Sequence, residues 1–138
     1  MREALKEAIK AFHEGEVPVG AVVIHEDRVI GRGHNQVERL KDPTAHAEII
    51  AITAAANTLG DWRLDGCEIY VTKEPCPMCA GAIMLSRIKK CVFGIKDEKM
   101  GALLSRYSIK REDLEIYYGV LADDCLNLLQ EFFRRLRV

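Results

Sequence analysis

Hydrophobic residues recur at helical spacing at the start of the chain. Across residues 2–14 the apolar positions fall on one side of a helix, which predicts an amphipathic helix that Gly15 ends. A closing helix is expected over residues 123–137, because two aspartates begin this segment and three arginines end it. Acidic groups at the N-terminal end and basic groups at the C-terminal end suit the helix dipole.

Apolar, β-branched runs between these two helices predict strands. Residues 19–24 and 28–33 flank the turn at Glu26-Asp27 and predict a hairpin. Three more strands are expected at 67–72, 91–95 and 115–120. Two more helices are expected, one at 45–58 opened by Asp42-Pro43-Thr44, and one at 77–86 that begins with Pro77.

Strands that alternate with helices in this way predict an α/β fold with a mixed five-stranded sheet covered by helices. The strands after Gly66 are joined through helical segments, so that half of the sheet is expected to be parallel. A length of 138 residues suits one domain with a single core, so residues 1–138 are interpreted as one domain.

Composition narrows the class of protein. Hydrophobic residues make up 49% and charged residues 30%, and no apolar run approaches the roughly 20 residues that cross a bilayer. The first residues lack the apolar centre of a secretory signal, so a cytoplasmic location is expected. Five cysteines, an odd number with two in a metal-type spacing, argue against a disulfide framework. A net charge of −1 argues against a broad nucleic-acid surface, although a local basic patch at the C-terminus would be compatible with it.

Two short motifs suggest a zinc site, namely His46-Ala47-Glu48 and Pro75-Cys76-Pro77-Met78-Cys79. One imidazole and two thiolates are good zinc ligands. Three ligands leave a fourth position for water, as in catalytic sites, whereas structural sites close the shell with four protein ligands. A structural zinc completed by Cys67 or Cys91 is the alternative, but both cysteines lie in strand-like runs where a buried free thiol is ordinary.

Helix geometry limits where such a metal can lie. Residues i and i+2 of a helix point about 200° apart, so His46 and Glu48 cannot both face a metal beside the helix. We therefore expect the metal beyond the N-terminal end of the helix. Two thiolates cancel the charge of the zinc ion and weaken its effect on a bound water, so a nearby base is useful, and Glu48 is positioned to be that base.

The H-A-E and P-C-x-x-C motifs resemble the established signature of the zinc-dependent nucleobase deaminases. The likeness to bacterial tRNA-specific adenosine deaminases extends over nearly the whole chain. It is carried by segments 17–22, 42–48, 74–82, 86–88 and 119–121, together with Asn35, Cys125 and Phe132-Phe133-Arg134.

The resemblance implies a three-layer α-β-α fold of the cytidine-deaminase type, one Zn²⁺ per subunit and a homodimer. It implies that Glu48 moves protons while water attacks the adenine carbon that bears the amino group, which yields ammonia and inosine at the wobble position of a tRNA anticodon. The implied zinc ligands are His46, Cys76 and Cys79, the implied nucleotide contacts are Asn35, Ala47 and Pro75, and the candidate RNA contacts are Asp97, Lys99, Phe132, Arg134 and Arg135.

This sequence departs from the family pattern around the expected substrate pocket. Lys73 stands where family members commonly carry leucine, and Met100 replaces a usual threonine. Leu103-Leu104-Ser105 replaces a stretch similar to Ala-Gly-Ser. These departures bear on the substrate and leave the residues of the chemistry unchanged.

Two other functions are compatible with parts of this sequence. A deaminase of a free base such as guanine or cytosine would use the same zinc chemistry, and the altered loop and slight acidity favour it. The C-terminal arginines favour tRNA, although they would equally suit the end of a helix, with at least one of Phe132 and Phe133 in the core. A zinc protein that only binds RNA is the third possibility, and Glu48 argues against it.

Overall fold

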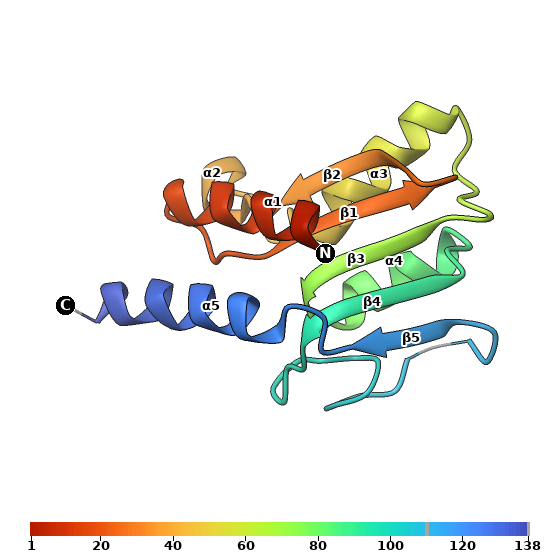
Figure 1. The fold of residues 1–138 in the computed structure, drawn as a ribbon. Helices are drawn as coiled ribbons and strands as arrows, with labels where there is room; N and C mark the ends of the chain where they lie inside the picture. Colours follow the sequence, from red (N-terminus) through yellow and green to blue (C-terminus); the bar gives the residue numbers. More distant parts are fainter. Residues whose placement is uncertain (110, 138) are drawn as a thin grey trace.

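The computed structural model describes residues 1–109 and 111–137, and its strands form one mixed sheet (Figure 1). The strands are β1 (Gly20–His25), β2 (Arg28–His34), β3 (Glu68–Lys73), β4 (Lys90–Ile95) and β5 (Glu115–Tyr118). The helices are α1 (Arg2–His13), α2 (Val37–Leu40), α3 (Ala47–Leu59), α4 (Pro77–Leu85) and α5 (Ala122–Leu136).

The strand order in the sheet is β2-β1-β3-β4-β5. Strand β1 runs antiparallel to both β2 and β3, whereas β4 runs parallel to both β3 and β5. The prediction of a parallel half is therefore confirmed. Helix α4 makes the crossover from β3 to β4, but the described residues between β4 and β5 contain no helix, so the expectation of a helical connection is wrong for that parallel pair.

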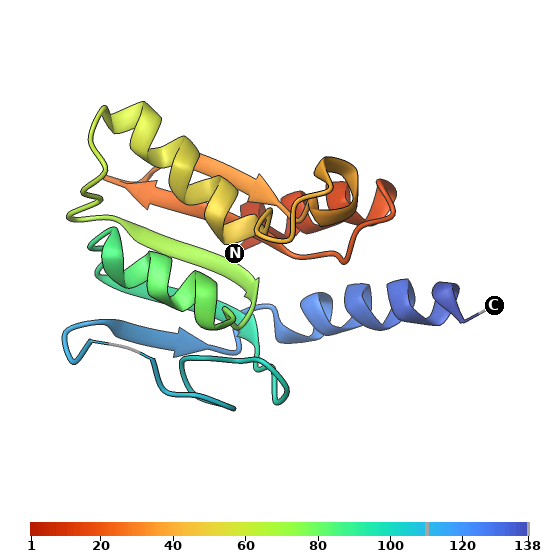
Figure 2. The ribbon, with the colours of Figure 1, turned by 180° about the vertical axis from the view of Figure 1, so that it is seen from behind.

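Helices cover both faces of the sheet and make three α-β-α layers, which confirms the predicted fold class. Helices α1 and α5 lie on one face, and α3 and α4 lie side by side on the other (Figures 1 and 2). Between the sheet and the second pair of helices the core includes the fully buried side chains of Ile69, Ile83 and Phe93. Helices α3 and α4 begin at the same end of the sheet, and the candidate site lies at that end.

The main differences from the sequence-based expectation are the start of α3 and the presence of the short helix α2, and β5 ends at Tyr118 and not at residue 120. Helix α3 begins at Ala47 and not at Ala45, because Asp42 binds the amide and hydroxyl of Thr44 and holds a turn before the helix. The short helix α2 was not predicted. It has only four residues and no buried side chain, so it leaves no hydrophobic period to detect.

Close approach of α3 to β2 depends on Gly31. An added Cβ there would lie 2.3 Å from the carbonyl oxygen of Ala51 and 2.6 Å from the amide nitrogen of Ala55. We expect Gly31→Ala to lower the free energy of unfolding by roughly 1–3 kcal/mol, because the helix backbone must move away from the strand. Urea denaturation measures this change. Asn57→Ala, on the exposed side of α3, is the control and should leave the unfolding midpoint nearly unchanged.

Candidate active site

His46, Cys76 and Cys79 come together where α3 and α4 begin. His46 is the residue that immediately precedes α3, Cys76 is the one that immediately precedes α4, and Cys79 lies in the first turn of α4. Their ligand atoms all lie within 4.8 Å of one another. The group therefore sits at the ends of the two helices and not along a helix flank, in keeping with the expectation from helix geometry.

The spacing of these atoms suits a tetrahedral zinc ion. His46 Nδ1 lies 3.6 Å from Cys76 Sγ and 3.5 Å from Cys79 Sγ. Tetrahedral bonds of about 2.0–2.1 Å to nitrogen and about 2.3 Å to sulfur separate two such ligands by roughly 3.6 Å. Among the described residues no fourth His, Cys, Asp or Glu joins the group, so Cys67 and Cys91 do not complete a structural site.

Contacts among the three side chains shift their pKa values. The Cys79 thiol and the His46 ring stabilise the Cys76 thiolate and lower the pKa of Cys76 to about 4, although burial opposes this. The same contact with Cys76, together with burial, raises the pKa of Cys79. Hydrogen bonding to Cys76 also raises the pKa of His46. A divalent cation would displace the protons of the ligand atoms, because zinc binds thiolate and neutral imidazole.

Glu48 is the second residue of α3 and lies beside the cysteine sulfurs. Only 4% of its surface is exposed, and burial raises the pKa of its carboxyl group. It does not belong to the group of ligand atoms that lie within 4.8 Å of one another. A buried carboxylate close to a three-ligand group, but outside it, can exchange protons with a group bound there.

A cavity of about 640 Å³ opens onto His46 and Glu48. Asn35 and Ala47 line it, as do Asp97, Met100 and the two phenylalanines of α5. This volume is typical of pockets for small ligands and accommodates a nucleobase. Pro75 is buried and is not among the residues that line the cavity, so of the three expected nucleotide contacts the structure brings Asn35 and Ala47 to it.

Among the described residues that line the cavity, Lys73 contributes the one Lys or Arg side chain. Its Nζ lies 3.2 Å from a carboxylate oxygen of Asp97, so the residue that departs from the family pattern pairs with an expected RNA contact. Partial burial would raise the pKa of Asp97, but Lys73 and nearby backbone amides outweigh it and lower the pKa. The pair fixes the loop after β4 to the end of β3.

Of the other expected RNA contacts, Phe132 lines the cavity, whereas Lys99, Arg134 and Arg135 do not. Phe132 is only 7% exposed and packs edge-on against Phe12, so the expectation that one phenylalanine of the pair is in the core is confirmed, while Phe133 is 41% exposed. Arg134 and Arg135 both pair with Glu131 on the same helix. Neither arginine lines the cavity, and Lys99 is exposed on the loop after β4.

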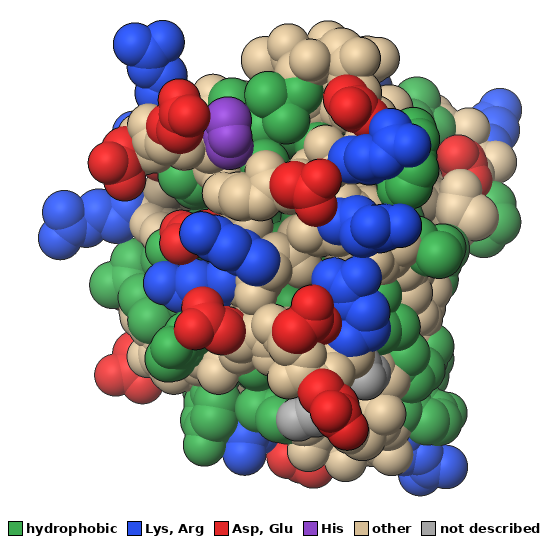
Figure 3. Space-filling model, turned by 90° about the vertical axis from the view of Figure 1, so that its right-hand side faces the viewer, with side chains coloured by type: hydrophobic (Ala, Val, Ile, Leu, Met, Phe, Trp, Pro, Cys, Tyr) green, Lys and Arg blue, Asp and Glu red, His purple; other side chains and the backbone are tan. Residues whose placement is uncertain are grey.

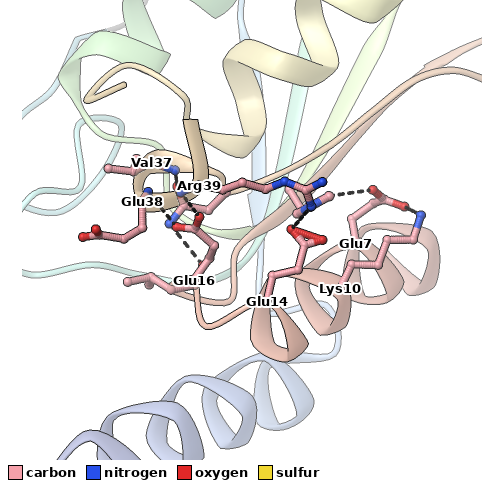
Figure 4. A network of polar contacts seen from close by, with 10 residues as sticks. Glu7, Lys10, Glu14, Glu16, Val37, Glu38 and Arg39 are labelled. Atoms are coloured by element: carbon pink, nitrogen blue, oxygen red, sulfur yellow. Dashed lines mark hydrogen bonds and ion pairs between the residues drawn. The ribbon is translucent and has the colours of Figure 1, made fainter. Parts of the chain in front are cut away.

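Two further buried glutamates line the cavity and were not predicted as site residues from the sequence. Glu16 accepts hydrogen bonds from the amides of Glu38 and Arg39 at 3.0 and 2.7 Å, and so holds α2 at the rim (Figure 4). Glu74 accepts amide hydrogen bonds from the loop after β4. Their partners lie 22 to 31 positions away in the chain, so no local pattern could have revealed them.

Fold and site together define a class of protein. A three-layer α-β-α domain with a His-Cys-Cys group at two helix ends, and a buried glutamate beside a base-sized cavity, has the parts of a metal-dependent nucleobase deaminase. Residues 1–137 match the family of MafB19-like deaminases, and the chain belongs to this family.

Individual relatives agree with this membership. A tRNA-specific adenosine deaminase of Bacillus subtilis (strain 168) is 46% identical over 142 residues, which cover 99% of this chain and 88% of the relative. A solved structure described for A-to-I editing by tRNA:A34 deaminases superposes with a TM-score of 0.88 at 40% identity, covering 94% of this chain and 97% of the other. Guanine deaminase from Bacillus subtilis superposes with a TM-score of 0.66 at 39% identity, covering 69% and 61%.

Proposed function

We propose that this protein is a zinc-dependent hydrolase that converts adenosine to inosine at the wobble position of a tRNA anticodon. The observation that supports it most is the His46, Cys76 and Cys79 group beside Glu48 in a base-sized cavity, in a chain that matches tRNA deaminases over nearly its whole length. Zinc bound by these three residues would activate water for attack on the base.

The residues of the chain have separable roles in this proposal. Glu48 takes a proton from the attacking water and delivers it to the departing amino group, and burial, which raises the pKa of its carboxyl group, favours the return of that proton. Asn35 and Ala47 hold the base against the wall of the cavity formed where α3 begins. Pro75, buried next to Cys76, contributes to nucleotide binding by fixing the start of α4.

The RNA surface is proposed to surround the cavity mouth. Asp97 and Lys99 would contact the nucleotides on the loop side, while Phe132, Arg134 and Arg135 would do so from α5. At the opposite end of the molecule, seen in Figure 3, the side chains of the described residues are intermixed acidic and basic and form no broad basic patch. Phosphate binding needs a surplus of positive charge, so that end is not the one we assign to RNA.

A homodimer and a cytoplasmic location are part of the proposal, as is the treatment of residues 1–138 as one domain. Exposed apolar side chains near the C-terminal end of α4 support a partner surface, since Leu85 is 77% and Trp62 is 53% exposed. Among the described residues, none of the helices has the length and apolar character needed to cross a bilayer.

Deamination of a free base is the second candidate, because the guanine deaminase structure shares the fold. That structure matches 69% of the chain, whereas the tRNA deaminase structure matches 94% with a higher TM-score. The relatives that are 42–46% identical to this chain over 98–99% of its length are tRNA-specific adenosine deaminases, and this favours the RNA substrate.

Incubation of the purified protein with unmodified tRNA tests this choice. We expect inosine in place of adenosine at the wobble position of at least one tRNA, detected by sequencing of the reverse-transcribed anticodon. Free guanine, cytosine and adenine are incubated in parallel, and ammonia release is measured. Ammonia from a free base, with no inosine in any tRNA, would replace the proposal with the second candidate.

A further inference from the structure

Glu74 is a buried carboxylate whose hydrogen bonds all reach one loop. It is 2% exposed and precedes Pro75 and the proposed zinc ligand Cys76. Its Oε2 accepts the amides of Leu103, Leu104 and Ser105 at 3.1, 2.7 and 3.1 Å. Its Oε1 accepts the Asp97 amide at 3.1 Å and the Ser105 hydroxyl.

The loop held in this way is a wall of the cavity. Asp97 and Met100 line the cavity together with Glu74 itself. The Ala102 amide donates to the carbonyl of Pro75 at 2.9 Å, so the same two segments are joined a second time next to Cys76. Hydrogen bonds therefore join the loop 97–105, which lines the cavity, directly to the segment that carries the proposed metal ligand Cys76.

Gly101 shows that the fit around the carboxylate is close. A Cβ at this position would lie 2.4 Å from Glu74 Oε1 and 2.5 Å from the carbonyl oxygen of Asp97. The loop therefore wraps the carboxylate with its backbone, and any side chain at residue 101 would push the two apart. Since a buried carboxylate is costly unless its oxygens accept hydrogen bonds, these amides are required partners.

We propose that Glu74 is a positioning residue for substrate binding, which rests on the deaminase function proposed above. Its carboxylate holds the loop 97–105 in the conformation that receives the substrate, in fixed relation to the start of α4. Substrate then binds a wall that is already ordered, and the cost of ordering the loop is not subtracted from the binding free energy. Without this carboxylate the loop must be ordered during binding, so KM rises while the proton transfers at Glu48 keep their rate.

Glu74→Gln is the sharpest variant. The oxygen of the glutamine side chain can still accept hydrogen bonds from the backbone amides of residues 103–105. Its NH2 group then faces the backbone amide of Asp97, which is itself a donor and needs an acceptor. We expect hydrogen exchange of the Asp97 amide to become at least about tenfold faster, since local opening no longer breaks a charged hydrogen bond. We expect KM for tRNA to rise about tenfold, with kcat within about threefold of the wild-type value and zinc content unchanged.

Two further variants make the result specific. Ser105→Ala removes only the hydroxyl donor to Oε1 and should produce a smaller rise in KM in the same direction. Glu7→Gln alters another buried glutamate, which pairs with Lys10 on α1 and does not line the cavity (Figure 4). It should leave KM and the exchange of the Asp97 amide unchanged even if it lowers the unfolding midpoint.

The outcomes separate this proposal from the proposed function. Unchanged Asp97 exchange and unchanged KM in Glu74→Gln would overturn the role of Glu74, as would loss of zinc or a fall in kcat alone. If the wild-type protein makes no inosine in tRNA, the proposed function fails. The exchange rates of Asp97 and residues 103–105 then still decide whether Glu74 holds the loop.

Discussion

Glu48→Gln is expected to lower kcat for tRNA deamination by about 10²–10⁴-fold, the range that a positioned general acid–base group contributes. Glutamine has nearly the same shape as glutamate but cannot take a proton from water or return one. The buried position of Glu48 beside the cysteine sulfurs means that bulk water cannot easily replace it as a proton carrier. Single-turnover measurement of inosine formation in tRNA isolates this chemical step.

Glu38→Gln is the matched control. Glu38 also lines the cavity, but its side chain is exposed at the rim, and it is the Glu38 backbone amide that binds Glu16. We expect this variant to keep kcat within about threefold of the wild-type value. Zinc content should be the same in both variants, because Glu48 lies outside the group of ligand atoms. Full activity of Glu48→Gln with bound zinc would remove Glu48 from the mechanism.

The grouping of His46, Cys76 and Cys79 could be predicted from the sequence because its signals are local. The spacing of Cys76 and Cys79, and the position of His46 close to a helix start, place each ligand relative to a helix end. Because both helices begin at the same end of the sheet, their N-terminal ends and the ligands beside them lie close together. Because Asp42 holds a turn there, α3 begins two residues later than predicted, yet His46 still lies at its N-terminal end.

The walls of the cavity could not be predicted in the same way. Their arrangement depends on hydrogen bonds between buried carboxylates and distant backbone amides, as at Glu16 and Glu74. An acidic residue in a loop is usually solvated, so neither glutamate stands out in the sequence. The pairing of Lys73 with Asp97 is likewise a contact between two segments that lie far apart in the chain.

Loss of a cysteine ligand is expected to have the second large effect. In Cys79→Ser the hydroxyl group replaces a thiolate that zinc binds well, so we expect little or no bound zinc and a fall in deamination of at least about 10³-fold. Stability should fall as well, because binding of a metal to the native state alone stabilises that state by RT ln(1 + [L]/Kd). Elemental analysis of the purified protein and its thermal unfolding midpoint measure both effects.

Cys67→Ala and a chelated wild-type sample make this result specific to the metal. Cys67 is fully buried but lies outside the ligand group, so its loss should leave one zinc per chain and retain activity. Chelation of the wild-type protein should lower activity and the unfolding midpoint, and added Zn²⁺ should restore both, because the three ligand atoms already lie at tetrahedral spacing. The same addition should not rescue Cys79→Ser. If the chelated wild-type protein kept its activity, water would have to be activated by Glu48 alone, and the His-Cys-Cys group would be a structural feature.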